Sequence, residues 1–369
     1  MLGERPLMRI LHLLPHLSRG GAERQFSYLA QEQIKLGQEV HVAYLYDDSP
    51  RPDLQNISLN QLKSSGNHDP YLLWQLIRLI RKINPDIVQT WITQMDILGG
   101  VAARITGVPW ILREPSSAMA YPSSWKNGLR IFIGSSANAI ISNSLCGKKY
   151  WQNKKLHCEL QVIRNGLPLY DIDREVANLP LNITGQDCPI VLCVGRLESN
   201  FSGKKNLSLF MQVLASTKEK HNIFGIICGT GSKRNELEKL AHKLGIHENL
   251  VFTGVLSVKS IWALMKKAAV YVSLSSFEGC PNTVMEAMAC GCPLVISDIP
   301  AHREILDESS AIFVDPSDIP QTTIAILDVL QNTVESKKRT LIARRIAESW
   351  TIKKMAAEYQ KVYRRVLTK

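Results

Sequence analysis

The sequence alternates short apolar runs, rich in β-branched residues, with longer segments of helical periodicity. Runs such as residues 8–14, 190–194 and 223–228 are typical of buried strands, and the segments that follow them are typical of helices. Strands that alternate with helices predict parallel sheets with helices on both faces. Because the rhythm occurs twice, we expect an α/β fold of two Rossmann-like domains that face each other across a cleft.

The 369 residues suit two domains of ordinary size. We expect the first domain over residues 1–166 and the second over residues 188–350. Residues 167–187 lack periodicity and are predicted to be a linker. Two long basic helices are expected at the end of the sequence, split near Trp350.

Several classes of protein are disfavoured by composition. No apolar run approaches the roughly 20 residues that span a bilayer, and residues 1–9 are charged and lead directly into a strand, unlike a secretory signal. The eight cysteines are scattered without a C-x-x-C pair, so neither a zinc site nor a disulfide framework is predicted. We therefore expect a reduced, cytoplasmic setting.

The net charge of +11 favours contact with an anionic partner, which could be nucleic acid, a membrane surface or a phosphorylated ligand. Aromatic residues are not interleaved with the basic ones, and no nucleic-acid module is recognised, so no nucleic-acid partner is expected. A solvated basic surface remains the simpler interpretation of any single cluster.

Residues 276–291 combine two carboxylates with a predicted strand–loop–helix junction. Glu278 is expected in the loop and Glu286 in the first helical turn. Ligands of open α/β sheets bind where strands lead into helix N-termini, and the amides of a first turn favour an anion. The two carboxylates could hold two hydroxyl-bearing parts of one ligand. Thr283 and Glu286 also match a capping box, in which Glu286 only satisfies a backbone amide.

Cations follow the first strand of the second domain. Gly195-Arg196 ends that strand, and Lys204-Lys205-Asn206 opens the next helix. An arginine fork with a nearby ammonium is suited to a diphosphate. The alternative is that both are ordinary surface cations.

Two glycine pairs occupy similar positions. Gly20-Gly21 follows the first strand and allows close approach of a phosphate or sugar. Gly229-Thr230-Gly231 could lie under a nucleotide base or ribose, but it lacks the G-x-G-x-x-G spacing of a dinucleotide fold. His16, a lone loop histidine, is given no role.

Together these residues resemble the retaining nucleotide-sugar glycosyltransferases of family 4 (group 1), which have the GT-B fold. The resemblance covers nearly the whole chain and is strongest in the E-x7-E motif from Glu278 to Glu286. The supporting motifs, in order, are Gly20-Gly21-Ala22-Glu23, Asn165-Gly166, Val194-Gly195-Arg196-Leu197, Lys205-Asn206, Gly229-Thr230-Gly231 and Phe252-Thr253-Gly254.

The resemblance implies roles for individual residues. Glu278 would hold hydroxyls of the donor sugar, Glu286 the nucleotide ribose, and Arg196 with Lys205 the departing diphosphate. The other donor-binding residues would be Gly20, Gly21, Gly195, Gly229, Gly231, Cys280, Pro281, Asn282 and Thr283. The segment from about 351 to 369 would return to the first domain.

The resemblance also implies an activity. The enzyme would be a hexosyltransferase (EC 2.4) that uses a UDP- or GDP-sugar, without a metal or another cofactor. The leaving diphosphate itself would accept the acceptor's proton. The acceptor would be a glycan or lipid-linked precursor of cell-envelope polysaccharide, reached from the cytoplasm at the inner membrane face. A GT-B UDP-sugar epimerase and an inactive nucleotide-sugar-binding scaffold are the alternatives.

The sequence departs from the family pattern at two places. Arg196 and Lys205 are nine positions apart, more than is usual, so residues 198–203 resemble a small insertion and Lys204 competes with Lys205 for the diphosphate. Where many members have a histidine after the strand near 109–112, this chain has Arg113-Glu114-Pro115. A role of Arg113 or Glu114 toward the acceptor is a hypothesis.

Overall fold

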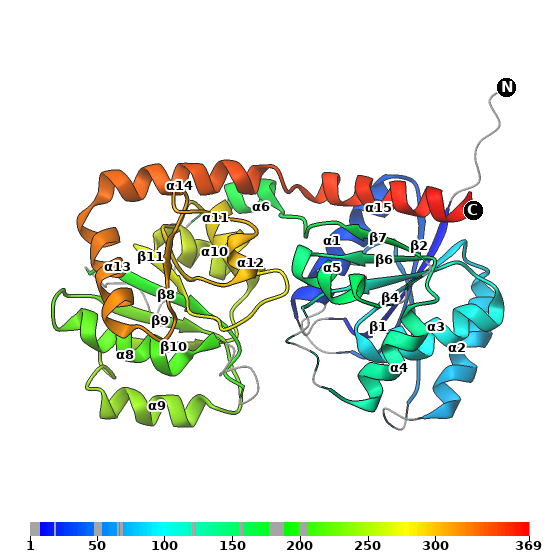
Figure 1. Cartoon of the computed structure of the whole chain (residues 1–369), viewed down its shortest axis with the longest axis horizontal. Coiled ribbons are helices and arrows are strands. Elements are labelled where there is room, and N and C mark those ends of the chain that lie inside the picture. The colour runs from blue at the N-terminus through cyan, green and yellow to red at the C-terminus, as the bar shows by residue number, and fades with distance from the viewer. Residues whose placement is uncertain are drawn as a thin grey trace. The chain divides into compact units, whose positions relative to one another are not determined.

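The computed structural model describes residues 8–17, 20–47, 54–64, 66, 69–117, 119, 121, 123–154, 156, 158–176, 188–198 and 205–368. The chain divides into two compact units. Unit 1 comprises Met1–Gly166 and Trp350–Lys369, and unit 2 comprises Leu167–Ser349. Figure 1 shows the elements of each unit along the chain.

Unit 1 is built on a seven-stranded parallel sheet in the order β3-β2-β1-β4-β5-β6-β7. The central strands are buried along their whole length, as expected for parallel strands covered by helices on both faces. The strands are β1 (Arg9–His16), β2 (Glu39–Tyr46), β3 (Ser58–Gln61), β4 (Ile87–Trp91), β5 (Trp110–Glu114), β6 (Ala139–Ser142) and β7 (Glu159–Val162).

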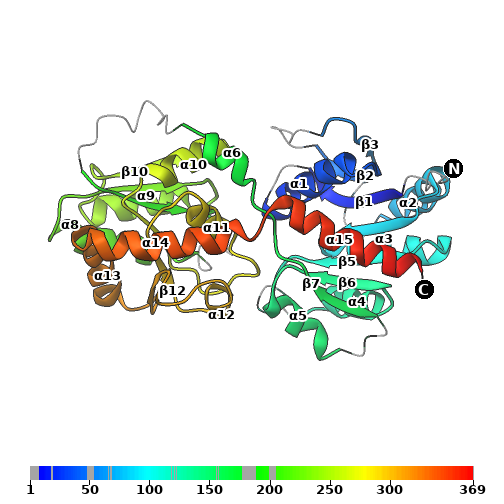
Figure 2. The same ribbon diagram turned by 90° about the horizontal axis from the view of Figure 1, so that it is seen from above.

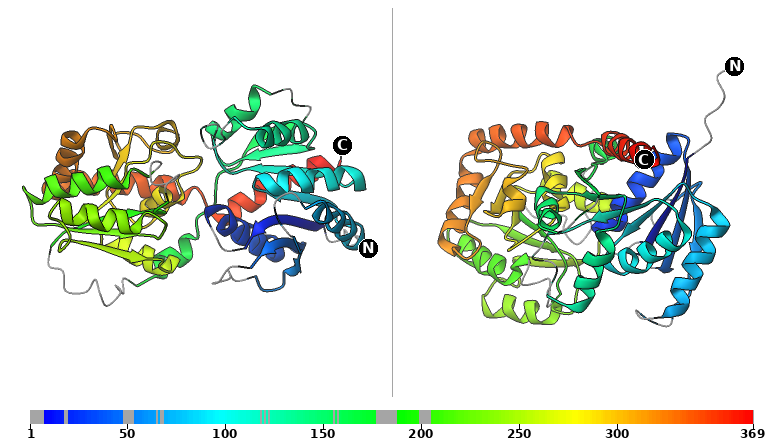
Figure 3. Two further views of the ribbon diagram at one scale, coloured as in Figure 1. Left: turned by 90° about the horizontal axis from the view of Figure 1, so that it is seen from below. Right: turned by 45° about the vertical axis from the view of Figure 1, so that its right-hand side comes forward.

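The helices of unit 1 form two layers. One core lies between the sheet and the helices α1 (Gly21–Lys35) and α15 (Ile352–Leu367). The other core lies on the opposite face of the sheet, and Figure 3 shows the unit from below in its left panel. Helices also cover this second core. These helices are α2 (Pro70–Ile83), α3 (Thr93–Thr106), α4 (Trp125–Gly134) and α5 (Leu145–Gln152).

Helix α15 is part of the unit 1 core. Its buried residues include Met355, Val362 and Val366, which pack with α1 and the sheet. Tyr363 donates to Oε1 of Gln89 at 2.5 Å, and Arg113 Nε donates to the Tyr359 hydroxyl at 3.1 Å. The last helix therefore completes the first unit.

Unit 2 has a six-stranded parallel sheet in the order β10-β9-β8-β11-β12-β13. Its strands are β8 (Ile190–Val194), β9 (Phe224–Cys228), β10 (Leu250–Gly254), β11 (Val270–Ser273), β12 (Leu294–Ser297) and β13 (Ile312–Val314). Its helices are α6 (Leu169–Arg174), α8 (Leu207–Lys218), α9 (Arg234–Lys243), α10 (Val258–Lys267), α11 (Asn282–Ala289), α12 (Pro300–Arg303), α13 (Ile319–Gln331) and α14 (Thr333–Glu348). Helix α11 packs against α14, which runs along the unit in Figure 2.

Helix ends follow the local signals of the sequence. Asp69 caps α2 by accepting from the Tyr71 amide at 2.9 Å, and Pro70 occupies the first turn. Four glycines that follow helices have φ values of 66° to 75°, a conformation that costs other residues a steric penalty. These are Gly37, Gly107, Gly245 and Gly291.

The predicted α/β class with two parallel sheets is confirmed. Helix α6 lies within the stretch predicted to be a linker, while residues 177–187 of that stretch lie outside the described residues. The strands β3 and β13 and the helices α10 and α12 were not predicted. None of the eight cysteines, all of them within the described residues, forms a disulfide. In the described parts of the chain, no helix is both long and apolar enough to span a bilayer.

Candidate active site

Most of the predicted donor-site residues lie at the carboxyl edge of the unit 2 sheet. In this sheet β8 lies between β9 and β11, and β12 follows β11. Because the strands are parallel, the loops that leave their carboxyl ends are neighbours. These loops carry Arg196, Gly229 and Glu278.

Glu278 and Lys205 form an ion pair at this edge. Lys205 Nζ lies 2.8 Å from Glu278 Oε1, although the residues are 73 positions apart in sequence. The side chains are 18% and 8% exposed, so water screens the pair little. An ammonium has three N–H donors and a carboxylate has two acceptor oxygens. The pair can therefore offer donors to a phosphate and acceptors to sugar hydroxyls at one place.

Asn206 holds the two partners in register. It has a left-handed backbone with φ 51° and ψ 42°, which asparagine tolerates better than most residues. Its Nδ2 donates to the Leu274 carbonyl at 2.7 Å and to Ser276 Oγ at 3.0 Å. The start of α8 is thereby tied to the loop that carries Glu278.

A series of buried hydrogen bonds orients Glu278 from the protein interior. Ser275 Oγ donates to Glu278 Oε1 at 2.8 Å, and Ser297 Oγ donates to the Ser275 carbonyl at 2.6 Å. His302 Nδ1 lies 2.8 Å from the Ser297 carbonyl and therefore carries the proton. Burial lowers the pKa of His302 to about 4, so the ring is neutral at pH 7. No motif of the sequence points to these residues, apart from the serines that follow β11.

Replacing Ser275 by alanine is expected to lower the transfer rate about fivefold to tenfold, because one hydrogen bond that orients Glu278 is lost. Ser275 acts through Glu278, so kcat should fall while the KM for donor stays within about twofold. The measurement is initial rates with a melting curve. Ser317→Ala is the matched control, since Ser317 donates to the exposed carboxylate of Asp315. An unchanged kcat in Ser275→Ala would contradict the positioning role.

Glu286 lies on α11, and the capping-box interpretation of it is wrong. The helix begins at Asn282 after Pro281, with no side-chain capping bond, whereas a capping box would require Thr283 at the N-cap. The Met285 amide already bonds to the Pro281 carbonyl at 3.0 Å. Glu286 consequently lies in the second turn, one turn later than predicted. Glu286 is buried, at 3% exposure.

The glycines of the Gly229-Thr230-Gly231 loop are required by backbone packing. A Cβ on Gly229 would lie 2.0 Å from the Gly195 carbonyl oxygen, and one on Gly231 would lie 2.3 Å from the carbonyl carbon of Leu197. Leu197 N also donates to the Thr230 carbonyl at 3.0 Å. The loop therefore fixes the backbone on either side of Arg196, whatever further contact it makes with a donor.

The remaining predicted residues are placed as follows. Arg196 is exposed on the loop after β8, and a Cβ on Gly195 would lie 3.1 Å from the Lys205 stem. Cys280, Pro281, Asn282 and Thr283 form the loop and first turn of α11. Gly20 and Gly21 begin α1 in unit 1. Lys204, the rival of Lys205, lies outside the described residues. The donor roles of all these residues stay predictions.

Two protein-family models match this chain. One, described as "Glycosyl transferases group 1", matches residues 182–346, and the other, "Glycosyltransferase Family 4", matches residues 19–170. Together they extend over most of both units. The chain belongs to the group 1, family 4 glycosyltransferases. The prediction of a glycosyltransferase (EC 2.4) is thereby confirmed at the level of the family.

Curated relatives are also glycosyltransferases by name. The chain is 25% identical over 394 residues to the Escherichia coli UDP-Gal:alpha-D-GlcNAc-diphosphoundecaprenol alpha-1,3-galactosyltransferase, with 96% of each covered. It is 29% identical over 169 residues to the O-antigen biosynthesis glycosyltransferase WclY of Escherichia coli, with 45% of this chain and 44% of WclY covered. It is 32% identical over 165 residues to an uncharacterized glycosyltransferase of Methanocaldococcus jannaschii, with 43% and 41% covered. The match thus spans less than half the length of the last two.

Solved structures share the fold. Anabaena HepE in complex with UDP and glucose superposes with a TM-score of 0.84 at 18% identity, covering 96% of this chain and 98% of HepE. The sucrose-phosphate synthase of Thermosynechococcus elongatus gives 0.81 at 18% identity, covering 98% and 99%. This likeness confirms the predicted GT-B fold of the glycosyltransferase.

Arg113 and Glu114 of the glycosyltransferase are both enclosed in unit 1, at 1% and 0% exposure. Arg113 donates to Asn165 Oδ1 at 2.5 Å and lies over the Trp91 ring. Glu114 forms an ion pair with Arg130 at 2.9 Å and accepts from Trp151 Nε1 at 2.9 Å. These contacts give both residues structural roles and leave neither at the surface, so the hypothesis of an acceptor role is not supported.

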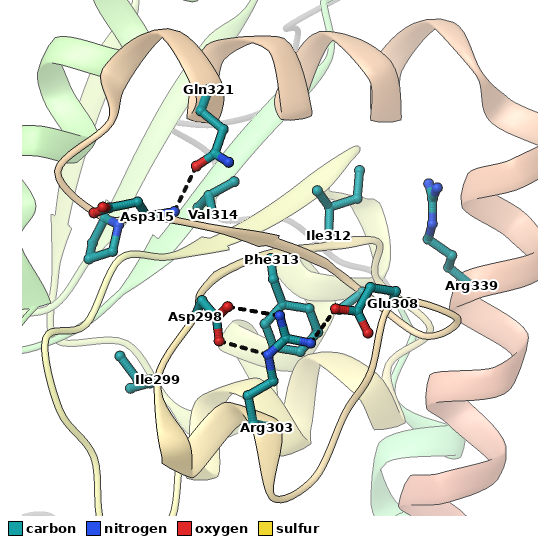
Figure 4. A pocket seen from close by; sticks show the side chains of 12 residues that line it. Asp298, Ile299, Arg303, Glu308, Ile312, Phe313, Val314, Asp315, Gln321 and Arg339 are labelled. Carbon is teal, nitrogen blue, oxygen red and sulfur yellow. Dashed lines mark hydrogen bonds and ion pairs between the residues drawn. The ribbon is translucent and has the colours of Figure 1, made fainter.

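A pocket of about 650 Å³ lies elsewhere in unit 2, beside β12 and β13. Figure 4 shows Arg303 stacked on Phe313, with its guanidinium paired to Asp298 and Glu308. The guanidinium carbon is 3.7 Å from the ring centroid. The lining of the pocket contains none of the predicted donor-site residues. The charge of Arg303 is already neutralised by two carboxylates. We assign it no role in catalysis.

Proposed function

We propose that this glycosyltransferase moves a hexosyl unit from a nucleoside diphosphate sugar to a hydroxyl of a lipid-linked or polysaccharide precursor, with retention of anomeric configuration. The observation that carries the proposal is the Lys205–Glu278 pair at the carboxyl edge of the unit 2 sheet. UDP is the proposed nucleotide, because the names of HepE complexes and of the galactosyltransferase relative refer to UDP or a UDP-sugar.

In the proposed reaction Glu278 accepts hydrogen bonds from hydroxyls of the donor sugar, and Glu286 holds the ribose. The bond from the anomeric carbon to the diphosphate breaks while the acceptor oxygen bonds to the same face of that carbon. The acceptor's proton passes to the leaving phosphate oxygen. Lys205 and Arg196 stabilise the negative charge that develops there, where one donor can contribute about 3–4 kcal/mol. No metal ion and no other cofactor is part of the proposal.

The acceptor class is inferred from two facts. The galactosyltransferase relative acts, by its name, on a diphosphoundecaprenol-linked sugar, and WclY belongs by its name to O-antigen biosynthesis. The positive net charge of the chain suits an acceptor carried by an anionic membrane. We propose that the enzyme works on cell-envelope precursors from the cytoplasmic side, as a peripheral protein of the inner membrane face.

Thermal stabilisation by UDP-, GDP- and ADP-sugars tests the donor site, since a ligand stabilises the folded state by RT ln(1 + [L]/Kd). We expect stabilisation by UDP-sugars, lost in Glu286→Ala and Arg196→Ala. Arg303→Ala is the matched control, because this exposed arginine of unit 2 is not a predicted donor residue. NMR of the product gives the configuration. Inversion, or equal stabilisation of wild type and both variants, would refute the proposal.

A further inference from the structure

The net positive charge of the chain comes entirely from unit 1. Unit 1 contains 25 lysines and arginines against 13 aspartates and glutamates, a net charge of +12. Unit 2 contains 19 against 20, a net charge of −1. If the positive charge served only to keep the protein soluble, it would not need to lie in one unit, because both units expose surface to water. An anionic partner would therefore meet unit 1.

Within unit 1, the helices over one face of the sheet are nearly free of carboxylates. The outer surface of α2, α3, α4 and α5, hereafter the helical face, contains seven cations that are not buried. Asp96 is the one acidic residue of these four helices, and it is fully buried against Arg130. The cations are Arg78, Arg81, Lys82, Arg104, Lys126, Lys148 and Lys149.

The same surface exposes large apolar side chains. On α4, Trp125, Leu129 and Phe132 are spaced i, i+4 and i+7 and share the solvent side of the helix, with Trp125 66% and Phe132 73% exposed. On α2, Tyr71 and Trp74 are stacked and half exposed. The buried side of α4 is already occupied by Arg130 and Ile133. An exposed apolar stripe opposite a packed one indicates a second partner for the helix.

We propose that the helical face docks on an anionic lipid bilayer. Aromatic rings beside lysines and arginines suit the headgroup region, where the rings lie at the apolar boundary and the cations meet lipid phosphates. Arg78 lies over the Trp74 ring and Lys126 over the Trp125 ring, which places charge and ring together. The inference rests on the proposed function, since a lipid-linked acceptor requires this contact. In sequence these residues are dispersed over α2–α5, and only the fold gathers them.

Vesicle sedimentation of the full chain tests the proposal. We expect binding to phosphatidylcholine vesicles with about one third phosphatidylglycerol, little binding to phosphatidylcholine alone, and weakening at high salt. Arg81→Gln/Lys82→Gln/Lys126→Gln should lower the partition coefficient at least about tenfold. The matched control Lys353→Gln/Lys354→Gln/Lys361→Gln removes three exposed cations from α15, on the other face of the sheet, and should lower it less than about twofold.

Trp125→Ser/Phe132→Ser tests the apolar part and should lower the binding that remains at high salt. Ile324→Ser/Val334→Ser, which removes two equally exposed apolar residues of unit 2, is its control. The proposal is overturned if test and control variants lose vesicle binding equally, or if the wild-type protein does not bind anionic vesicles. A dimer dissociated by the aromatic variant, or RNA binding in place of vesicle binding, also overturns it.

The test is separable from that of the proposed function. Stabilisation by nucleotide sugars, and transfer to a short water-soluble acceptor without vesicles, should be unchanged in all four helical-face and control variants. Vesicle binding without nucleotide binding would refute the proposed function and keep the docking surface. Nucleotide binding and transfer without vesicle binding would refute the docking surface alone.

Discussion

Lys205→Met is expected to lower the rate of sugar transfer by a factor of about one hundred to one thousand, the range found when one preorganised donor to a developing charge is removed. The ammonium lies 2.8 Å from Glu278, and in the proposed reaction its remaining protons face the leaving diphosphate. Because methionine keeps most of the stem against Gly195, the loop should stay packed. Initial rates with the donor found by thermal shift are the measurement.

Glu278→Gln is the companion variant in a double-mutant cycle. The two residues touch, so the double variant should lose much less than the product of the single losses. Lys243→Met, at the exposed end of α9, is the control for replacing a lysine in unit 2. If either single variant kept more than one third of the wild-type rate, or the two losses multiplied, the pair would not be the catalytic centre.

Arg130→Met is expected to destabilise unit 1 by about 3–5 kcal/mol, as is typical when one partner of a buried ion pair is removed. The guanidinium lies 2.8 Å from Asp96 and 2.9 Å from Glu114, and all three side chains have no exposed surface. Methionine fills much of the volume but leaves two carboxylates without a cation. Denaturant unfolding measures the effect. Arg104→Met, an exposed arginine on α3, should change stability by less than about 0.5 kcal/mol.

The loss in Arg130→Met should depend on pH. Burial raises the pKa of Asp96 to about 6, and the Arg130 charge opposes that rise. The folded state therefore holds the proton more tightly than the unfolded chain, so this group lowers stability as the pH rises from about 4 to 6. Without Arg130 the pKa of Asp96 should rise further, and the deficit relative to wild type should be smaller at pH 5 than at pH 8. A deficit independent of pH would contradict this account.

The elements that sequence analysis found are those with a strong pattern. β8 coincides with the predicted run of residues 190–194, and β9 lies within that of residues 223–228, because buried parallel strands are apolar along their whole length. β3 was missed because Ser58–Gln61 is an exposed edge strand, with polar residues at most positions. β13 has three residues only. Helix α10 was missed although Ser257 caps it and Val258, Ile261, Trp262 and Met265 have the i, i+3, i+4, i+7 spacing of an amphipathic helix.

The sequence named the residues of the candidate site, but not the contacts between their side chains. The E-x7-E spacing identified Glu278 and Glu286, whereas pairing Glu278 with Lys205 requires β8 and β11 to be neighbours, which no local pattern shows. The support of Glu278 by Ser275 is a hydrogen bond within a buried loop, and no spacing in the sequence predicts it. The same limit applies to Arg113 and Glu114, since only the fold shows that both are enclosed.

The position of α15 has a consequence for synthesis on the ribosome. Unit 2 is continuous in sequence, so all of its strands can pair before α15 has been made. Unit 1 begins first but finishes last, because Tyr359 and Tyr363 supply part of its core and partners for Arg113 and Gln89. While residues 167–349 are being synthesised, the face of the unit 1 sheet that α15 covers keeps part of its apolar surface exposed. A chaperone would therefore have the most apolar surface to cover on unit 1, before α15 has been synthesised.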